Sequence, residues 1–245
     1  MIRGFVKFSL NIGILFVLFC GLGLISPLQA YDVIPVAHGG ELFGTIKFRG
    51  VPPSNEIFRE TKTPEFCGST VQAETFIVNP ENNGIKNVVI LIENIERGKK
   101  PIISTLVVEN RHCHFVPHVQ FGMVGNSFEI RNSDPVLHNT HLHLEDVTLL
   151  NVAMPPKGRN VKKNILQKGI VKINCDAHKF MQGWVLISEN PYSAVTDQEG
   201  NFAISDIPPG NYKVKVWHEG IPVQEKEITV TSDKKTNLSI ELAIK

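Results

Sequence analysis

The residues that decide the fold are Cys175-Asp176-Ala177-His178-Lys179-Phe180-Met181-Gln182-Gly183-Trp184. They lie between two β-rich runs, residues 171–174 and residues 185–187. Such runs predict strands, and a short loop between them predicts that the strands are neighbours in one sheet. A thiol, an imidazole and a thioether at the spacing Cys-x2-His-x2-Met would then point from that loop at one centre.

A second histidine for this centre lies upstream, in Asn132-Ser133-Asp134-Pro135-Val136-Leu137-His138-Asn139. A predicted strand over residues 127–131 ends there in a proline turn that would deliver His138. Two imidazoles and a thiolate in one plane, with a long axial thioether, are the ligands of a blue-copper site. We therefore expect one copper ion, with Asn139 hydrogen-bonded across to the cysteine loop. The expected ligands are His138, Cys175, His178 and Met181.

Zinc is the rival metal, because one cysteine and two histidines also suit a catalytic zinc ion. Zinc chemistry would need a general base and a substrate pocket, and the sequence carries no signature of either. We therefore expect electron transfer at this centre, and no enzymatic turnover.

At these residues the chain resembles the cupredoxins, and its loop is similar to the amicyanin type. The shared features are the short Cys-x2-His-x2-Met spacing and the glycine two residues after Met181. The plastocyanin type has a longer gap before the methionine. The resemblance covers roughly residues 40–188. It implies a Greek-key β-sandwich, copper at the four residues named above, and a one-electron carrier.

A new pattern of short strands starts beyond Asn190-Pro191. Gly200-Asn201-Phe202 and Ile207-Pro208-Pro209-Gly210-Asn211-Tyr212 resemble the carboxypeptidase-regulatory-like module. Exported methylamine-utilisation-type and plastocyanin-like proteins append this module to a copper domain. The resemblance implies a small prealbumin-like β-sandwich with a carbohydrate-binding-like fold, which by itself does not establish sugar binding. A tail this short should lean on the first domain.

The rest of the chain favours the same all-β class. No long stretch has the period of an amphipathic helix, and short β-rich runs alternate with turn residues. The predicted strands of the first domain are residues 44–48, 87–92, 104–108, 127–131, 169–174 and 184–188. We expect a signal peptide over residues 1–30, a cupredoxin-like copper domain over 31–189 and a carboxypeptidase-regulatory-like β-sandwich over 190–245.

The first thirty residues have the three parts of a secretory signal. Arg3 and Lys7 precede an apolar run over residues 10–25, and Leu28-Gln29-Ala30 offers a cleavage site. A membrane anchor is the alternative, but the run is shorter than the ~20 residues that span a bilayer. We expect a periplasmic or secreted protein with no stable membrane span after cleavage.

Cysteine usage fits an oxidising compartment. Of the four cysteines, Cys20 lies in the signal, which leaves Cys67, Cys113 and Cys175. We expect a Cys67–Cys113 disulfide and a metal bond that protects Cys175. The alternative makes Cys113, with its neighbouring histidines, part of a second metal site.

The remaining histidines leave two interpretations open. They are His112, His114, His118, His141 and His143. His141 and His143 are two residues apart on the strand that begins at His138, so their side chains lie on the same face of that strand. They are either sheet-surface residues or a second, weaker copper or zinc site.

These observations predict an exported type 1 copper protein that carries single electrons between redox protein partners. With 25 basic and 24 acidic residues and no basic stripe, nucleic acid is not an expected partner. One alternative is copper storage or delivery, using the extra histidines. Another is a surface carbohydrate-binding or adhesive protein with a non-redox metal site and glycan contact through its tail.

Overall fold

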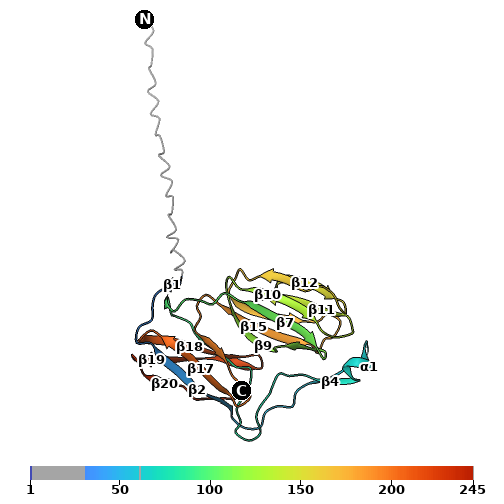
Figure 1. Ribbon diagram of the computed structural model, residues 1–245, viewed down its shortest axis with the longest axis horizontal. Coiled ribbons are helices and arrows are strands. Elements are labelled where there is room, and N and C mark those ends of the chain that lie inside the picture. The colour runs from blue at the N-terminus through green and yellow to red at the C-terminus, as the bar shows by residue number, and fades with distance from the viewer. Residues whose placement is uncertain (2–30, 61, 245) are drawn as a thin grey trace.

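The computed structural model describes residue 1, residues 31–60 and residues 62–244. The expected signal peptide over residues 1–30 therefore lies, Met1 apart, outside the described residues. Figure 1 shows two bodies of β-sheet packed side by side. The described residues contain a single short helix, α1 (Pro64–Cys67). None of their helices is both long and apolar enough to cross a membrane.

The first body is a sandwich of two sheets, which confirms the predicted all-β class. Its smaller sheet has the strand order β13 (Val161–Asn164), β10 (Ser127–Asn132), β7 (Thr105–Arg111), β8 (His114–Val116). Its larger sheet has the order β12 (Val147–Met154), β11 (His138–Leu144), β14 (Gly169–Asn174), β15 (Gln182–Ser188), β9 (Val119–Met123). The pairs β7–β10 and β15–β9 are parallel, and all other pairs in these sheets are antiparallel.

The core of this sandwich follows from alternation along its strands. In β10, Phe128 and Ile130 point inward and are almost fully buried, while their neighbours are not. Leu142 in β11 and Ile173 in β14 face them from the other sheet. Burying each such side chain stabilises the fold by about 1.5–3 kcal/mol.

The second body is a smaller sandwich built from both ends of the chain. One sheet has the order β16 (Ser193–Val195), β5 (Val89–Ile92), β18 (Gly210–His218), β19 (Ile221–Val230). The other has the order β17 (Asn201–Ile207), β2 (Gly40–Phe48), β20 (Lys235–Asn237), and β21 (Ile240–Leu242) also pairs with β2. The two N-terminal strands, β2 and β5, lie at the centre of these sheets.

This pairing corrects the expected domain boundary at residue 189. Residues 40–48 and 89–92 were expected in the first domain, but they pair with strands of the tail. Leu42, Ile46 and Ile90 are fully buried in the core of the second sandwich. The first sandwich is therefore inserted between β5 and β16 of the second. A local pattern identifies a strand but not its partner, and these partners lie more than a hundred residues away.

The two sandwiches meet through the outer face of β5. Its Ile90 and Ile92 point into the second core, while Val89 and Leu91 point the other way. There they pack with Val119, Leu186 and Trp217 in a separate apolar cluster. The expectation that the small module leans on the first domain is confirmed.

A further segment covers one end of the first sandwich. It is the hairpin β3 (Ile57–Arg59) and β4 (Thr70–Gln72), with α1 between the two strands. Figure 1 shows α1 and β4 beside the ends of the strands of the first sandwich. The predicted disulfide is confirmed: Cys67 in α1 is bonded to Cys113, which lies in the turn between β7 and β8. We call residues 57–72 the cap. The short pair β1 (Asp32–Val33) and β6 (Arg97–Gly98) lies elsewhere.

Candidate metal centre

Two strand ends bring the predicted ligands together. His138 opens β11, and Cys175 directly follows the last residue of β14. These strands are antiparallel, with His141 opposite Asn174, so the start of one lies beside the end of the other. The loop of residues 175–181 then returns into β15, which pairs with β14 as expected.

Three of the four predicted ligands converge inside the protein. The Nδ1 atoms of His138 and His178 lie 3.1 Å apart, and the Cys175 Sγ lies 3.6 Å from the His178 Nδ1. All three side chains are at most 2% exposed. Two nitrogen lone pairs that face each other at this distance repel unless a proton or a metal cation lies between them. The three residues form one of the groups of this structure that could hold a metal ion.

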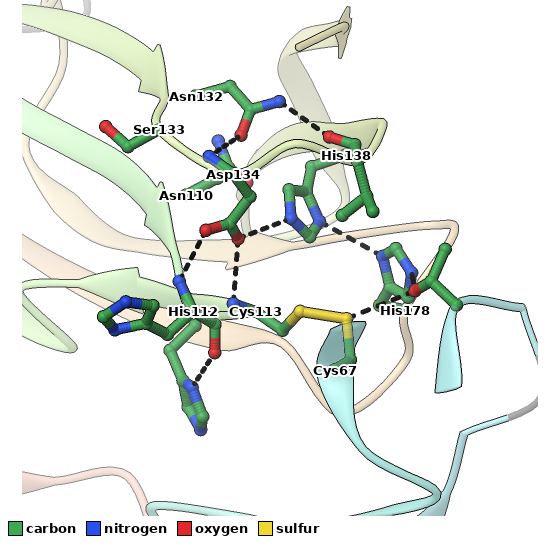
Figure 2. Close-up of polar contacts among 12 residues, drawn as sticks. Cys67, Asn110, His112, Cys113, Asn132, Ser133, Asp134, His138 and His178 are labelled. Carbon is green, nitrogen blue, oxygen red and sulfur yellow. Dashed lines mark hydrogen bonds and ion pairs between the residues drawn. A yellow bond between two sulfur atoms is a disulfide. The ribbon is translucent and has the colours of Figure 1, made fainter. Parts of the chain in front are cut away.

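The outer nitrogen of each imidazole has its own partner. The Nε2 of His138 lies 2.8 Å from a carboxylate oxygen of Asp134, and the Nε2 of His178 lies 2.9 Å from the Thr63 hydroxyl. An ionised carboxylate only accepts hydrogen bonds, so the Nε2 of a neutral His138 carries the proton. Its Nδ1 lone pair therefore points at Cys175 and His178. Figure 2 shows the His138 ring between the Asp134 carboxylate and the His178 ring.

Main-chain hydrogen bonds fix the cysteine loop. The Cys175 N–H donates to the carbonyl of Met181, and the Met181 N–H donates to the carbonyl of His178. The expected role of Asn139 is confirmed: its Oδ1 accepts from the Asp176 N–H at 3.0 Å, and its own N–H donates to the Cys175 Sγ at 3.3 Å. Met181 closes the loop and is 1% exposed in the same core.

A close approach explains the glycine that follows the methionine. A Cβ at Gly183 would lie 3.2 Å from the His118 carbonyl oxygen and 3.2 Å from the Phe115 Cβ. A larger residue would push β15 away from its neighbours. The loop of residues 175–181, which ends where β15 begins, would move with it.

Burial sets the protonation of the centre. It lowers the pKa of His138, against the pull of Asp134, and it lowers the pKa of His178, helped by the neighbouring His138. Burial raises the pKa of the Cys175 thiol, which three backbone hydrogen bonds only partly oppose. The imidazoles are therefore neutral at neutral pH and can act as ligands. The thiol keeps its proton until a cation replaces it.

Sequence reasoning missed two residues of the centre. Asp134 stood in the quoted Asn-Ser-Asp-Pro turn, but nothing in its spacing indicated that it reaches back to His138. Thr63 carried no signal, because it comes from the cap, more than a hundred residues before His178. Asp134 is 4% exposed, so its contact with His138 is shielded from water.

The other histidines do not join this centre. The rings of His141 and His143 lie 3.7 Å apart, and His141 contacts Asp176 and Thr148. His114 turns back to the carbonyl of His112, while His118 contacts Glu219 between the sandwiches. Within the described ranges, only one other group of His, Cys, Asp or Glu has ligand atoms close enough for a metal. It consists of Cys113, Asp134 and His138.

Comparison with solved structures gives weak likenesses to copper proteins. A reduced amicyanin mutant is 20% identical, with a TM-score of 0.31, covering 34% of this chain and 82% of that one. A copper-containing nitrite reductase from Thermus scotoductus is 20% identical, with a TM-score of 0.32, covering 37% of this chain and 23% of that one. A purple cupredoxin from Nitrosopumilus maritimus is 20% identical, with a TM-score of 0.31, covering 35% and 99%.

Sequence comparison gives one family. Residues 185–243 match the family model of the carboxypeptidase regulatory-like domain. None of the curated proteins compared with the chain matches it in sequence. The match includes every tail strand of the second sandwich, but not β2 and β5, which complete it.

The class of the first body follows from its own architecture, because the structural likenesses are too low to carry an argument. It consists of two packed sheets with the parallel pairs β7–β10 and β15–β9 and a His–Cys–His group at their strand ends, as the resemblance to the cupredoxins predicts. The chain thus joins this metal-site sandwich to a second β-sandwich whose tail strands match the carboxypeptidase regulatory-like family model.

Proposed function

We propose that this is an exported type 1 copper protein that carries single electrons between redox protein partners. The observation that carries the proposal is the buried convergence of two imidazole Nδ1 atoms and one thiol sulfur. One soft sulfur with two imidazoles suits copper, and Met181 in the same loop is the candidate for a weak axial ligand. Bound copper would supply a couple between Cu(II) and Cu(I).

The chain's own residues would keep this centre rigid. Asp134 and Thr63 hold the outer nitrogens of the imidazoles, and Asn139 holds the cysteine loop. Ligands fixed in this way change little between oxidation states, which lowers the cost of reorganisation during electron transfer. Export to the periplasm or beyond rests on the signal pattern of residues 1–30.

The experiment is a Cu(II) titration of the protein beginning at Tyr31, followed by visible spectroscopy. We expect one copper per chain and an intense visible band, because charge transfer from a thiolate to Cu(II) needs Cys175. Cys175→Ser should keep the far-ultraviolet circular dichroism of the wild type and lose the band. A colourless wild-type protein with copper bound would contradict the proposal.

The same titration separates the alternatives. Storage or delivery would give more than one copper per chain and fast transfer to a copper chelator. A carbohydrate-binding protein would show glycan binding and no reversible one-electron reduction. Trp217, the tryptophan of the tail, is only 6% exposed and leaves little ring surface for a sugar to stack on. We expect no nucleic-acid partner and no catalytic turnover of a substrate.

A further inference from the structure

A second group of metal-binding side chains lies directly behind the candidate copper centre. The sulfur of Cys113, a carboxylate oxygen of Asp134 and a ring nitrogen of His138 all lie within 4.8 Å of one another. All three residues are buried, at 1%, 4% and 0% exposure. The sulfur of Cys113 is bonded to that of Cys67, so a second sulfur adjoins the group.

The Asp134 carboxylate is held in place between the disulfide and the imidazole. Its Oδ1 accepts from the His112 N–H at 2.7 Å, and its Oδ2 accepts from the Cys113 N–H at 2.9 Å. The same Oδ2 lies 2.8 Å from the His138 Nε2. Figure 2 shows this carboxylate between the two backbone N–H groups and the His138 ring, with the disulfide beside it.

We propose that reduction of the Cys67–Cys113 disulfide turns this group into a second metal site, specific for a thiophilic divalent ion of the Zn(II) class. Its ligands are the two cysteine sulfurs, the Asp134 carboxylate and the His138 Nε2. Two thiolates, one oxygen and one nitrogen make a closed tetrahedral set of the kind that binds zinc. His138 would serve one centre at a time, because binding at Nε2 moves its ring proton to the Nδ1 that faces Cys175 and His178.

The loading step balances with a dithiol as the reductant. A thiolate of the dithiol attacks Cys67, which is half-buried and therefore easier to reach than Cys113. The Cys67–Cys113 bond breaks, a disulfide forms in the dithiol, and its two protons end on the cysteine sulfurs. The metal ion then displaces those protons, and the proton on the His138 Nε2 moves to its Nδ1. The reverse exchange, in which the disulfide form of the dithiol takes up the two electrons, restores the Cys67–Cys113 bond, removes two ligands and releases the ion.

The test uses the Cys175→Ser protein beginning at Tyr31, so it does not depend on copper at the first centre. In this variant Cys67 and Cys113 are the only cysteines. After anaerobic reduction with a phosphine, Co(II) is added, and the near-ultraviolet band from thiolate to cobalt is followed. We expect one cobalt per chain with an absorption typical of two thiolates, displaced by one equivalent of Zn(II). The unreduced protein should show no such band.

Two further measurements test the ligands separately from the fold. Asp134→Asn should weaken Zn(II) binding by more than the roughly tenfold that loss of a supporting hydrogen bond costs. The control Asp146→Asn, at an exposed turn outside the group, should leave it unchanged. Independently of any further substitution, one equivalent of Zn(II) should protect both reduced thiols from alkylation, as counted by mass spectrometry. The proposal is overturned if the thiols alkylate equally fast with and without Zn(II), or if reduction gives no cobalt band.

Discussion

At the scale of single residues, the orientation of the His138 ring depends on the Asp134 carboxylate, a contact that no sequence motif predicts. Asp134 holds the proton on the Nε2 of the ring and so turns the Nδ1 lone pair toward Cys175. A ligating histidine commonly has such a partner, which fixes both its tautomer and its orientation. The carboxylate is also tied to the turn that carries Cys113, so one side chain supports both the ligand and the disulfide.

Asp134→Asn should therefore weaken copper binding. The amide can donate a hydrogen bond to the Nε2 of His138, which would place the ring proton on Nδ1, where it competes with the metal. We expect a loss of about 10–100-fold in Cu(II) affinity, measured by competition with a chelator. Asp146→Asn is the matched control. An affinity equal to that of the wild type would show that Asp134 does not position the ligand.

At the scale of elements, the cysteine loop could be predicted because all its information is local. The expected strand over residues 169–174 agrees with β14, and the next strand begins only two residues before its expected start. The cap could not be predicted in the same way. Nothing in residues 57–72 indicates that Thr63 reaches His178, because His178 lies 115 residues further along the chain.

Removing the disulfide should loosen the cap over the centre. We expect Cys67→Ser with Cys113→Ser to lower the free energy of unfolding of the metal-free protein by about 2–5 kcal/mol. Hydrogen exchange in residues 57–72 should become faster than in the wild type, because only the Thr63–His178 hydrogen bond and the apolar packing of Phe58 and Val71 would then hold the hairpin to the sandwich. The measurement is denaturant unfolding with exchange mass spectrometry. Unchanged exchange in the cap would contradict a tethering role for the bond.

At the scale of the whole molecule, the two sandwiches are interleaved along the chain. The predicted strands at residues 44–48 and 87–92 exist, as β2 and β5, but their partners are tail strands. Alternation of apolar residues fixes which face of a strand is buried, but it does not specify the sheet. The copper-type sandwich is an insertion in the other body, and β5 is buried between the two cores.

A chain that ends at Glu189 should consequently fail to fold well. Leu42, Ile46 and Ile90 are all fully buried against tail strands and would be exposed to water. We expect aggregation, or a loss of cooperative unfolding, in size-exclusion chromatography and thermal melts. The control is the full chain with Lys234→Gln, a change at an exposed position. A soluble, cooperatively unfolding truncated protein would contradict the interleaved arrangement.

Acid should destabilise the molecule through the buried His218. Burial lowers the pKa of this residue to about 4, although the nearby Glu219 opposes the shift. An unfolded histidine titrates near pH ~6.5, so between that pH and about 4 the unfolded state binds more protons. Unfolding free energy should therefore fall as the pH falls through this window, by up to about 3 kcal/mol from this residue.

The measurement is denaturant unfolding of the metal-free protein from pH 7 to pH 4. His218→Gln removes the titrating group, so its stability should fall less steeply over the same range. Equal slopes for the two proteins would show that His218 is not the group responsible.

The most direct test of the central claim is to compare His138→Ala with the double variant His141→Gln, His143→Gln. The Nδ1 of His138 lies 3.1 Å from that of His178, whereas His141 contacts Asp176 and Thr148 instead. Copper stoichiometry and the visible spectrum are measured side by side. We predict that His138→Ala loses or grossly alters the charge-transfer band, and that the double variant keeps it with one copper per chain. A blue His138→Ala protein beside a bleached double variant would contradict the account.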